Sequence, residues 1–336
     1  MFDGVRRQPP ARRRLKIFPY DPVLGRVAGN RICIDIANEP VKPGPRGLKV
    51  EVLDYDSTLD TFYPPLDLNA PDVLMSDGLE PSEGDHRFHQ QMVYAVAMKT
   101  IENFERALGR EIRFRGNRPL KLFPHAFRGA NAFYDPESRS IFFGYFRADE
   151  ASPGSNIPKQ WVFTCLSHDI VAHETTHAIV DKLRFRYRYP TNRDALAFHE
   201  AIADVVAIFQ HFTFPEVLSE AIRTTRADLR SASPLIELAV QFGHGTGKGE
   251  ALRSALDGAT PDPTLYATTV EPHERGSILV AAIFDGFFRV YQSRIEDLLR
   301  LATGGTGKLP DGALHPDLVN RAANEAAGAA DEVLRV

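Results

Sequence analysis

The spacing of apolar residues along the chain predicts a series of amphipathic helices. Between Asp85 and Leu108, apolar residues recur every three or four positions, which is the period of one helix face. The set is Phe88, Met92, Val93, Val96, Ala97, Ile101 and Phe104. Gly109 follows at once, and glycine commonly ends a helix because it accepts a left-handed backbone. The same period predicts further helices over residues 166–183, 194–212, 276–301 and 318–336.

Short runs of β-forming residues accompany these helices and indicate strands. Two of them, Arg31–Ile36 and Leu48–Leu53, lie in the first part of the chain, which is rich in Pro, Gly and Asp. Two more, Leu120–Phe123 and Ser140–Phe146, lie between the first and second predicted helices. We therefore expect an α+β fold, with a β-rich N-terminal lobe and a mainly helical C-terminal lobe.

Length and charge place the chain among ordinary globular proteins. Of its 336 residues, 43% are hydrophobic and 25% are charged, so it can bury a sizeable core. The formal net charge of -4 argues against nucleic acid or an anionic membrane as a partner. No run of about 18 apolar residues exists that could span a bilayer. We expect the two cysteines, Cys33 and Cys165, to be buried free thiols. Because no apolar signal segment follows the basic N-terminal arm, we expect a cytoplasmic protein.

The segment His173-Glu174-Thr175-Thr176-His177 is the most informative motif in the chain. Two histidines four residues apart lie on the same face of a helix, one turn apart, so one divalent ion can bind both rings. Glu174 lies close to that face without being a ligand, which lets its carboxylate take a proton from a water activated by the metal. The same five residues also arise by chance on ordinary helices, so a third ligand has to be found.

The next predicted helix offers that ligand. A catalytic zinc site has three protein ligands and an open fourth position. Glu200 and Asp204 are one turn apart on a helix whose other residues are largely apolar. Buried carboxylates in such surroundings usually have a charged partner or a metal. We therefore predict His173, His177 and Glu200 as zinc ligands, with Asp204 accepting a hydrogen bond from a ligand histidine.

Together these segments resemble the thermolysin-type gluzincin peptidases. That family has D-V-V-x-H-E-x-x-H on its first zinc helix, and residues 169–177 read D-I-V-A-H-E-T-T-H. Four further segments are similar to family segments and follow in the family's order. They are Asn131-Ala132-Phe133, Glu200-Ala201-Ile202-Ala203-Asp204, Leu252-Arg253-Ser254-Ala255-Leu256-Asp257 and Pro272-His273-Glu274-Arg275-Gly276-Ser277-Ile278. The resemblance implies a thermolysin-like two-lobed architecture with the zinc cleft between the lobes.

The resemblance also implies roles for residues outside the metal motif. Asn131 and Ala132 match the edge strand that hydrogen-bonds the substrate backbone. Arg253 matches an arginine that binds a substrate carbonyl, and His273 matches the histidine that stabilises the transition state.

Two further features follow from the resemblance. The family's transition-state tyrosine corresponds to Tyr187 or Tyr189, of which we prefer Tyr189. The calcium-binding carboxylates of the secreted family members are largely absent, because His211 replaces an acidic residue and only Asp169 remains. The expected cofactor is therefore Zn²⁺ alone, without calcium.

These expectations divide the chain into three parts. Residues 1–84 form an N-terminal β/loop region with a basic arm, residues 85–192 a catalytic lobe with the edge strand and the first zinc helix, and residues 193–336 a helical lobe with the third ligand and His273. The expected activity is that of a zinc metalloendopeptidase acting on a peptide or protein, with Glu174 as general base. One alternative is a zinc aminopeptidase, although residues 129–133 lack that group's G-A-M-E-N strand. The other is a zinc-bearing scaffold that binds peptides or proteins without cleaving them.

Overall fold

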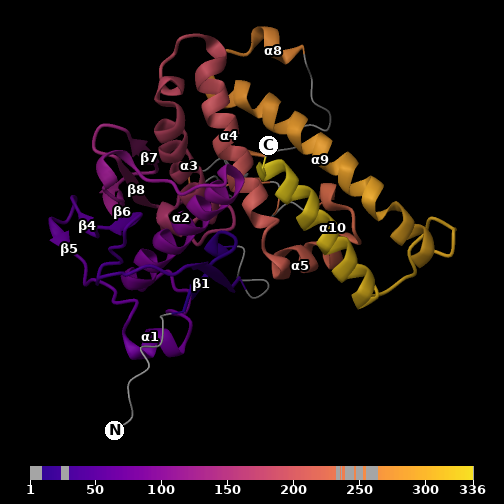
Figure 1. The fold of residues 1–336 in the computed structure, drawn as a ribbon, viewed down its shortest axis with the longest axis horizontal. Helices are drawn as coiled ribbons and strands as arrows, with labels where there is room; N and C mark the ends of the chain where they lie inside the picture. The colour runs from indigo at the N-terminus through magenta and orange to yellow at the C-terminus, as the bar shows by residue number, and fades with distance from the viewer. Residues whose placement is uncertain are drawn as a thin grey trace.

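The computed structural model describes residues 10–23, 30–231, 235, 237–238, 246, 253–254 and 264–335. A long buried helix, α2 (His86–Leu108), lies inside the N-terminal half (Figure 1). It begins where the side chain of Asp85 accepts a hydrogen bond from the Arg87 backbone N–H, and it ends at Gly109 in a left-handed conformation with φ of 64°. The predicted helix and its glycine stop are both confirmed.

A mixed sheet packs beside α2. Its strands run in the order β3 (Val50–Val52), β6 (Leu120–Arg128), β8 (Ser140–Arg147) and β7 (Ala132–Asp135), and β9 (Trp161–Phe163) also pairs with β8. The strands β3, β6 and β8 are parallel, whereas β7 and β9 are antiparallel to β8. The described residues leave β7 at an edge of this sheet.

Smaller elements complete the N-terminal half. The strands β1 (Arg12–Ile17) and β2 (Ile32–Ala37) form an antiparallel pair, as do β4 (Tyr55–Asp56) and β5 (Thr61–Phe62), and α1 (Pro71–Met75) is a short helix. The expected strands near residues 31, 48, 120 and 140 are confirmed as β2, β3, β6 and β8.

The C-terminal half is mainly helical, as expected. Its helices are α3 (His168–Arg184), α4 (Arg193–His211), α5 (Pro215–Thr225), α8 (Leu265–Thr268), α9 (Pro272–Ala302) and α10 (Pro316–Arg335). The remaining short elements are η2 (Arg115–Asn117), η3 (Thr164–Leu166), η4 (Phe185–Arg188), η5 (Leu229–Ser231), β10 (Glu237–Leu238) and β11 (Arg253–Ser254). The fold is thus a mixed α+β arrangement, and the division into three parts stays a prediction.

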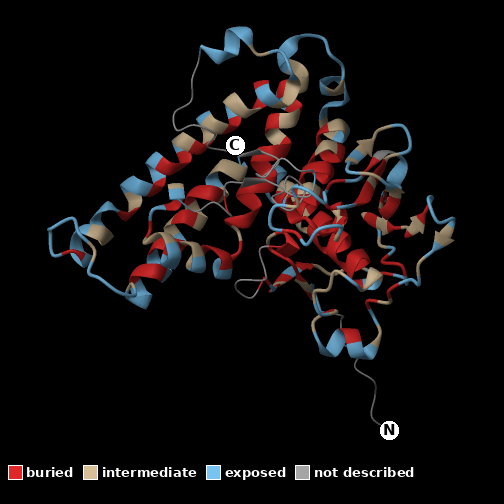
Figure 2. Ribbon diagram, turned by 180° about the vertical axis from the view of Figure 1, so that it is seen from behind, coloured by how far each residue is buried: buried red, intermediate tan, exposed pale blue. Residues whose placement is uncertain are grey.

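The buried residues gather where α2, α3 and α4 meet (Figure 2). A cluster of tilted and edge-on rings joins α4 to α9, formed by Phe209, Phe212, Phe284, Phe287 and Phe288. These rings fix the position of α4, because aromatic side chains bury more apolar area than other residues. Within the described residues no single helix is long and apolar enough to cross a membrane, and α4 and α5 qualify only as a pair bent by 83°.

The cysteines follow the expectation only in part. Both are free, and Cys165 is buried. Cys33 is only half-buried, so its predicted burial was wrong. It lies on β2 between Ile32 and Ile34, which are buried, and alternate residues of a strand face opposite sides. The expected cytoplasmic location stays a prediction.

The far end of the α3–α4 pair is held by a buried polar cluster. Asp169 accepts a hydrogen bond from His211 Nε2, and its Oδ1 also lies 3.5 Å from His168 Nδ1. The side-chain amide of Gln210 donates to His168 Nε2 at 3.1 Å. Burial and the neighbouring His211 lower the pKa of His168 to about 4. Burial opposes ionisation of Asp169, but His211 and His168 outweigh it and lower the pKa of this carboxyl.

We expect this cluster to make folding sensitive to acid. Between pH 6.5 and 4 the unfolded chain binds a proton at His168 that the folded chain does not bind, so the free energy of unfolding falls as the pH falls through this range. The parent should lose about 3 kcal/mol more than His168→Asn between pH 7 and pH 4. Urea unfolding of both proteins at the two pH values measures this difference. An equal loss in parent and variant would contradict the assignment.

Candidate metal centre

The helix α3 brings two imidazole rings to one face. The side chains of His173 and His177 are nearly buried, and their ring centroids lie 4.4 Å apart. The opposite face of the helix is anchored in the core by Val171, Ala172 and Ile179, which are fully buried. The two rings therefore lie one turn apart on a fixed helix, as the sequence predicted.

The helix α4 aims two carboxylates at those rings. It begins at Asn192, whose side chain accepts hydrogen bonds from the backbone N–H groups of the next turn. Glu200 Oε2 lies 3.3 Å from His173 Nε2 and 3.5 Å from His177 Nε2. Asp204 Oδ1 lies 2.8 Å from His173 Nδ1. Glu200 thus points at the two histidines, and Asp204 contacts one of them from the other side.

The chemistry of these groups fits a zinc ion. An ionised Asp204 only accepts hydrogen bonds, so His173 carries its proton on Nδ1 and presents a lone pair at Nε2. That lone pair faces the carboxylate oxygen of Glu200, and two acceptors facing each other repel unless a cation or a proton lies between them. Two imidazole nitrogens and one carboxylate oxygen form a common ligand set of catalytic zinc. A carboxylate on the second nitrogen of a ligand histidine is the usual orienting partner.

Electrostatics favours the forms that bind metal. Burial would raise the pKa of Glu200, but the nearby imidazoles of His173, His177 and His273 outweigh it and hold this pKa far below its usual range. Burial and the neighbouring His173 lower the pKa of His177. The carboxylate is therefore ionised and His177 neutral at pH 7, and these are the protonation states that a metal requires.

Glu174 lies beside the two histidines and is held by the edge strand. An oxygen from its carboxylate and a nitrogen from each of His173 and His177 lie within 4.8 Å of one another. Its Oε2 accepts a hydrogen bond from the backbone N–H of Tyr134 at 2.9 Å. The carboxylate that is predicted to be the base is thus fixed by the strand that is predicted to hold the substrate.

The same hydrogen bond shows which way β7 faces. Backbone groups of a strand alternate between its two edges, so Ala132 directs its N–H and C=O to the same side as the Tyr134 N–H. This side is the one away from β8, with which Ala132 and Tyr134 are paired opposite Phe143 and Ile141. Ala132 therefore offers a donor and an acceptor beside Glu174.

Asn131 lies at the start of this strand in a tight turn. Its carbonyl accepts a hydrogen bond from Gly144 N–H at 2.9 Å, and the residue itself is exposed. A Cβ added at Gly144 would lie 2.7 Å from the Asn131 carbonyl oxygen and 2.3 Å from that of Gly129. The turn can therefore approach β8 only because residue 144 is glycine.

His273 comes to the metal residues from the first turn of α9. Its Nε2 lies 3.1 Å from Glu200 Oε2, and its Nδ1 lies 2.9 Å from Glu271 Oε1. The helix can pack this closely because a Cβ at Gly276 would lie only 2.8 Å from the Ala197 carbonyl oxygen of α4. The histidine is half-exposed, so it faces both the metal residues and the solvent.

Three predicted residues are not brought to this centre by the described contacts. The hydroxyl of Tyr189 accepts a hydrogen bond from Arg188, and the ring of Tyr187 packs on Phe198. Neither hydroxyl contacts His173, His177 or Glu200. Arg253 belongs to β11, which pairs with β10, and its side chain lies outside the described residues. The absence of calcium stays a prediction. Asp169 pairs with His211 in the buried polar cluster described above.

Several contacts at the centre were not expected from the sequence. The ring of His199 stacks on His177 with centroids 4.6 Å apart, and burial together with His177 lowers the pKa of His199 to about 4. Glu271, which contacts His273, is also the N-cap of α9 and accepts from the Glu274 N–H. A carboxylate just before Pro272 indicates such a cap, so the sequence could have predicted that Glu271 lies beside His273. The role of the Tyr134 N–H could not, because every residue except proline has that group.

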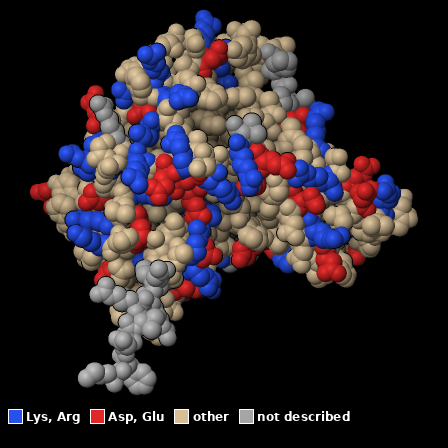
Figure 3. Space-filling model, in the orientation of Figure 1, with Lys and Arg blue, Asp and Glu red and all other residues tan. Residues whose placement is uncertain are grey.

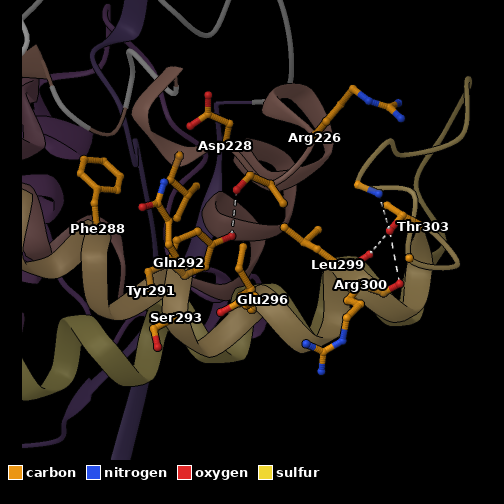
Figure 4. A pocket seen from close by; sticks show the side chains of 15 residues that line it. Arg226, Asp228, Phe288, Tyr291, Gln292, Ser293, Glu296, Leu299, Arg300 and Thr303 are labelled. Carbon is orange, nitrogen blue, oxygen red and sulfur yellow. Dashed lines mark hydrogen bonds between the residues drawn. The ribbon is translucent and has the colours of Figure 1, made fainter.

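The surface also has hollows away from the metal residues. One of about 550 Å³ is formed by the second half of α9 and the residues around Asp228 (Figure 4). In it the Tyr291 hydroxyl donates to the Ala227 carbonyl, and Arg226 and Glu296 lie at its sides. Among the described residues that line this hollow there is no histidine and none of the metal residues named above.

Comparison with known proteins finds similarity among solved structures. No family model and no curated protein matches this chain. The chain is similar to the precursor of protealysin, a metalloproteinase from Serratia proteamaculans, with 14% identity, 89% of each chain covered and a TM-score of 0.45. A likeness at this level does not establish a common fold, so the interpretation of the centre rests on its own geometry.

We expect the purified protein to bind about one zinc ion per chain. Glu200→Gln removes the only charged ligand and should abolish retention of zinc through dialysis. Asp204→Asn should weaken zinc affinity by about 10- to 100-fold, because the orienting carboxylate is lost. Glu216→Gln, an exposed change on α5, is the matched control. Elemental analysis after dialysis and competition with a chelating dye measure both effects. Parent affinity in Glu200→Gln would exclude the assigned ligand set.

Proposed function

We propose that this chain is a zinc-dependent endopeptidase with a thermolysin-like two-lobed architecture. The observation that carries the proposal is the convergence of His173, His177 and Glu200 beside a carboxylate, Glu174, that is held by an edge strand. The collinear sequence segments that resemble gluzincin peptidases support the same conclusion. A scaffold that only binds zinc would not need a base fixed at this position.

His173, His177 and Glu200 would hold the zinc ion, which when bound acts as a Lewis acid toward a carbonyl oxygen and lowers the pKa of a water. Glu174 takes a proton from the attacking water and later delivers it to the departing amine. The Tyr134 N–H holds Oε2 of Glu174, which keeps this carboxylate beside the two histidines. Asp204 keeps the ring of His173 in the required orientation.

The substrate would bind as an added strand along β7. Ala132 pairs with the peptide backbone through its N–H and C=O, and the Asn131 side chain holds the peptide at the start of the strand. Arg253 would bind a carbonyl of the substrate. Backbone pairing of this kind fixes the register of the peptide next to Glu174 more than its sequence.

His273 would stabilise the negative charge that develops on the carbonyl oxygen. Its position beside Glu200 places a donor near the metal residues, and Glu271 fixes the orientation of the ring. Tyr189 would supply a second donor. Its hydroxyl contacts Arg188 in the described structure, so this role requires that the 185–192 connection close onto the substrate.

We expect Glu174→Gln to bind zinc like the parent but to cleave peptides at least about 100-fold more slowly, because general base catalysis is lost. Cleavage of a quenched fluorescent peptide library, with both peptide ends blocked, is measured with and without a chelator. Blocked ends separate an endopeptidase from an aminopeptidase. Glu111→Gln, an exposed carboxylate, is the control. Equal rates in Glu174→Gln and parent would show that the base is wrongly assigned.

The two tyrosines can be separated by removing one hydroxyl at a time. Tyr189→Phe should lower kcat by about 100-fold with little change in KM, because a donor to the transition state is lost. Tyr187→Phe keeps its ring contact with Phe198 and should cleave at nearly the parent rate. Steady-state kinetics on one peptide measures both. The reverse result would assign the role to Tyr187.

A further inference from the structure

The connection between α3 and α4 has an unusual composition. Residues 184–193 read Arg-Phe-Arg-Tyr-Arg-Tyr-Pro-Thr-Asn-Arg, and no Asp or Glu occurs from Lys182 to Arg193. The whole chain has a formal charge of -4, so this segment is a local excess of positive charge on a mildly acidic protein. We call its four arginines, Arg184, Arg186, Arg188 and Arg193, the arginine turn.

The side chains of this segment are largely exposed. Phe185 is 55% exposed and Tyr189 is 45% exposed. Among the described residues, Arg184, Arg186 and Arg193 have no carboxylate within 4.0 Å, whereas Arg188 lies 3.7 Å from Asp181. Figure 3 shows basic side chains at the upper end of the molecule, where Figure 1 places the α3–α4 connection. Three cations and several rings are thus presented to solvent together.

The arginine turn is tied to the elements of the metal centre. The hydroxyl of Tyr134, whose N–H holds Glu174, donates to Asp181, which in turn faces Arg188. The ring of Tyr187 packs on Phe198, two residues before Glu200.

A third contact runs to the His273 helix. Arg275 Nε donates to Asp194, the residue after Arg193, at 2.7 Å. Arg184 follows His177 by seven helical residues, a rise of about 10 Å, which an extended peptide covers with about three residues. A peptide lying along β7 would therefore bring its flanking side chains within reach of the arginine turn.

We propose that the arginine turn selects peptide substrates that carry Asp or Glu within a few residues of the scissile bond, next to apolar or aromatic residues. This inference rests on the proposed peptidase function and names its substrate class. The guanidinium groups pair with carboxylates, and the exposed rings of Phe185 and Tyr189 cover the apolar side chains of the peptide. Nucleic acid and anionic membranes are less suited, because the basic group is confined to one connection on an acidic protein.

The test uses three peptides with one apolar core and two flanking residues on each side, which are Glu, Gln or Lys. Binding of each fluorescein-labelled peptide to zinc-loaded Glu174→Gln is measured by anisotropy, so that cleavage is not required. The Glu peptide should bind about tenfold more tightly than the Gln peptide at 50 mM NaCl, and this preference should shrink at 300 mM NaCl, because exposed ion pairs are screened by salt.

Variants then locate the preference. Arg184→Gln/Arg186→Gln, added to Glu174→Gln, should reduce the preference for the Glu peptide to about twofold or less and leave binding of the Gln peptide unchanged. Arg110→Gln/Arg118→Gln, a pair of exposed arginines after α2, should retain the full preference. Unchanged binding of the Gln peptide also shows that the arginine variant is folded.

The outcomes separate this inference from the proposed function. Equal binding of the Glu and Gln peptides, or a preference that survives in Arg184→Gln/Arg186→Gln, overturns the inference even if the parent cleaves the Gln peptide. Preferred binding of the Glu peptide without cleavage by the parent supports the preference of the arginine turn for acidic peptides but overturns the proposed function, and with it the claim that these peptides are substrates. Tighter binding to phosphatidylserine vesicles or to single-stranded RNA than to the Glu peptide also overturns the inference.

Discussion

The packing of α4 against α3 is the interaction on which the centre depends. It places Glu200 Oε2 within 3.5 Å of two imidazole nitrogens that come from a different helix. Isolated in solution, three such groups would not converge, because desolvating a carboxylate is costly. The aromatic cluster between α4 and α9 and the polar cluster at His211 hold the C-terminal end of α4, so the cost is offset by packing elsewhere.

A second constraint links the sheet to the helices. The Tyr134 N–H of β7 binds Glu174, and the Tyr134 hydroxyl binds Asp181 on the same helix. One residue of the edge strand therefore fixes the position of α3 relative to the unpaired edge that β7 has among the described residues. Both links are short, so the distance between this edge of β7 and the Glu174 carboxylate is set by the fold rather than by a flexible side chain.

Close approach of backbone segments shapes the rest of the centre. Gly144 admits the turn that carries Asn131, and Gly276 lets α9 lie against α4. In both places a Cβ would meet a carbonyl oxygen at less than 3 Å. These glycines contribute no chemical group, yet they decide where Asn131 and His273 lie.

The sequence by itself determined where the main helices lie and which residues carry the proposed chemistry. The apolar period located α2, α3 and α4, because these helices obtain their stability from one apolar face, and Gly109 located the end of α2. The spacing of His173 and His177 determined that their rings share a face, since helix geometry alone sets it. The burial of Cys33 was mispredicted, because composition does not tell which face of β2 is covered.

Only the tertiary structure decided which groups meet across elements. The aim of Glu200, the contact between Asp204 and His173, and the pairing of His273 with Glu271 and Glu200 depend on helix packing. The backbone donor of Tyr134 carries no sequence signature. Periodicity fixes directions within one element, but distances between elements depend on how side chains pack in the core, which a single sequence does not display.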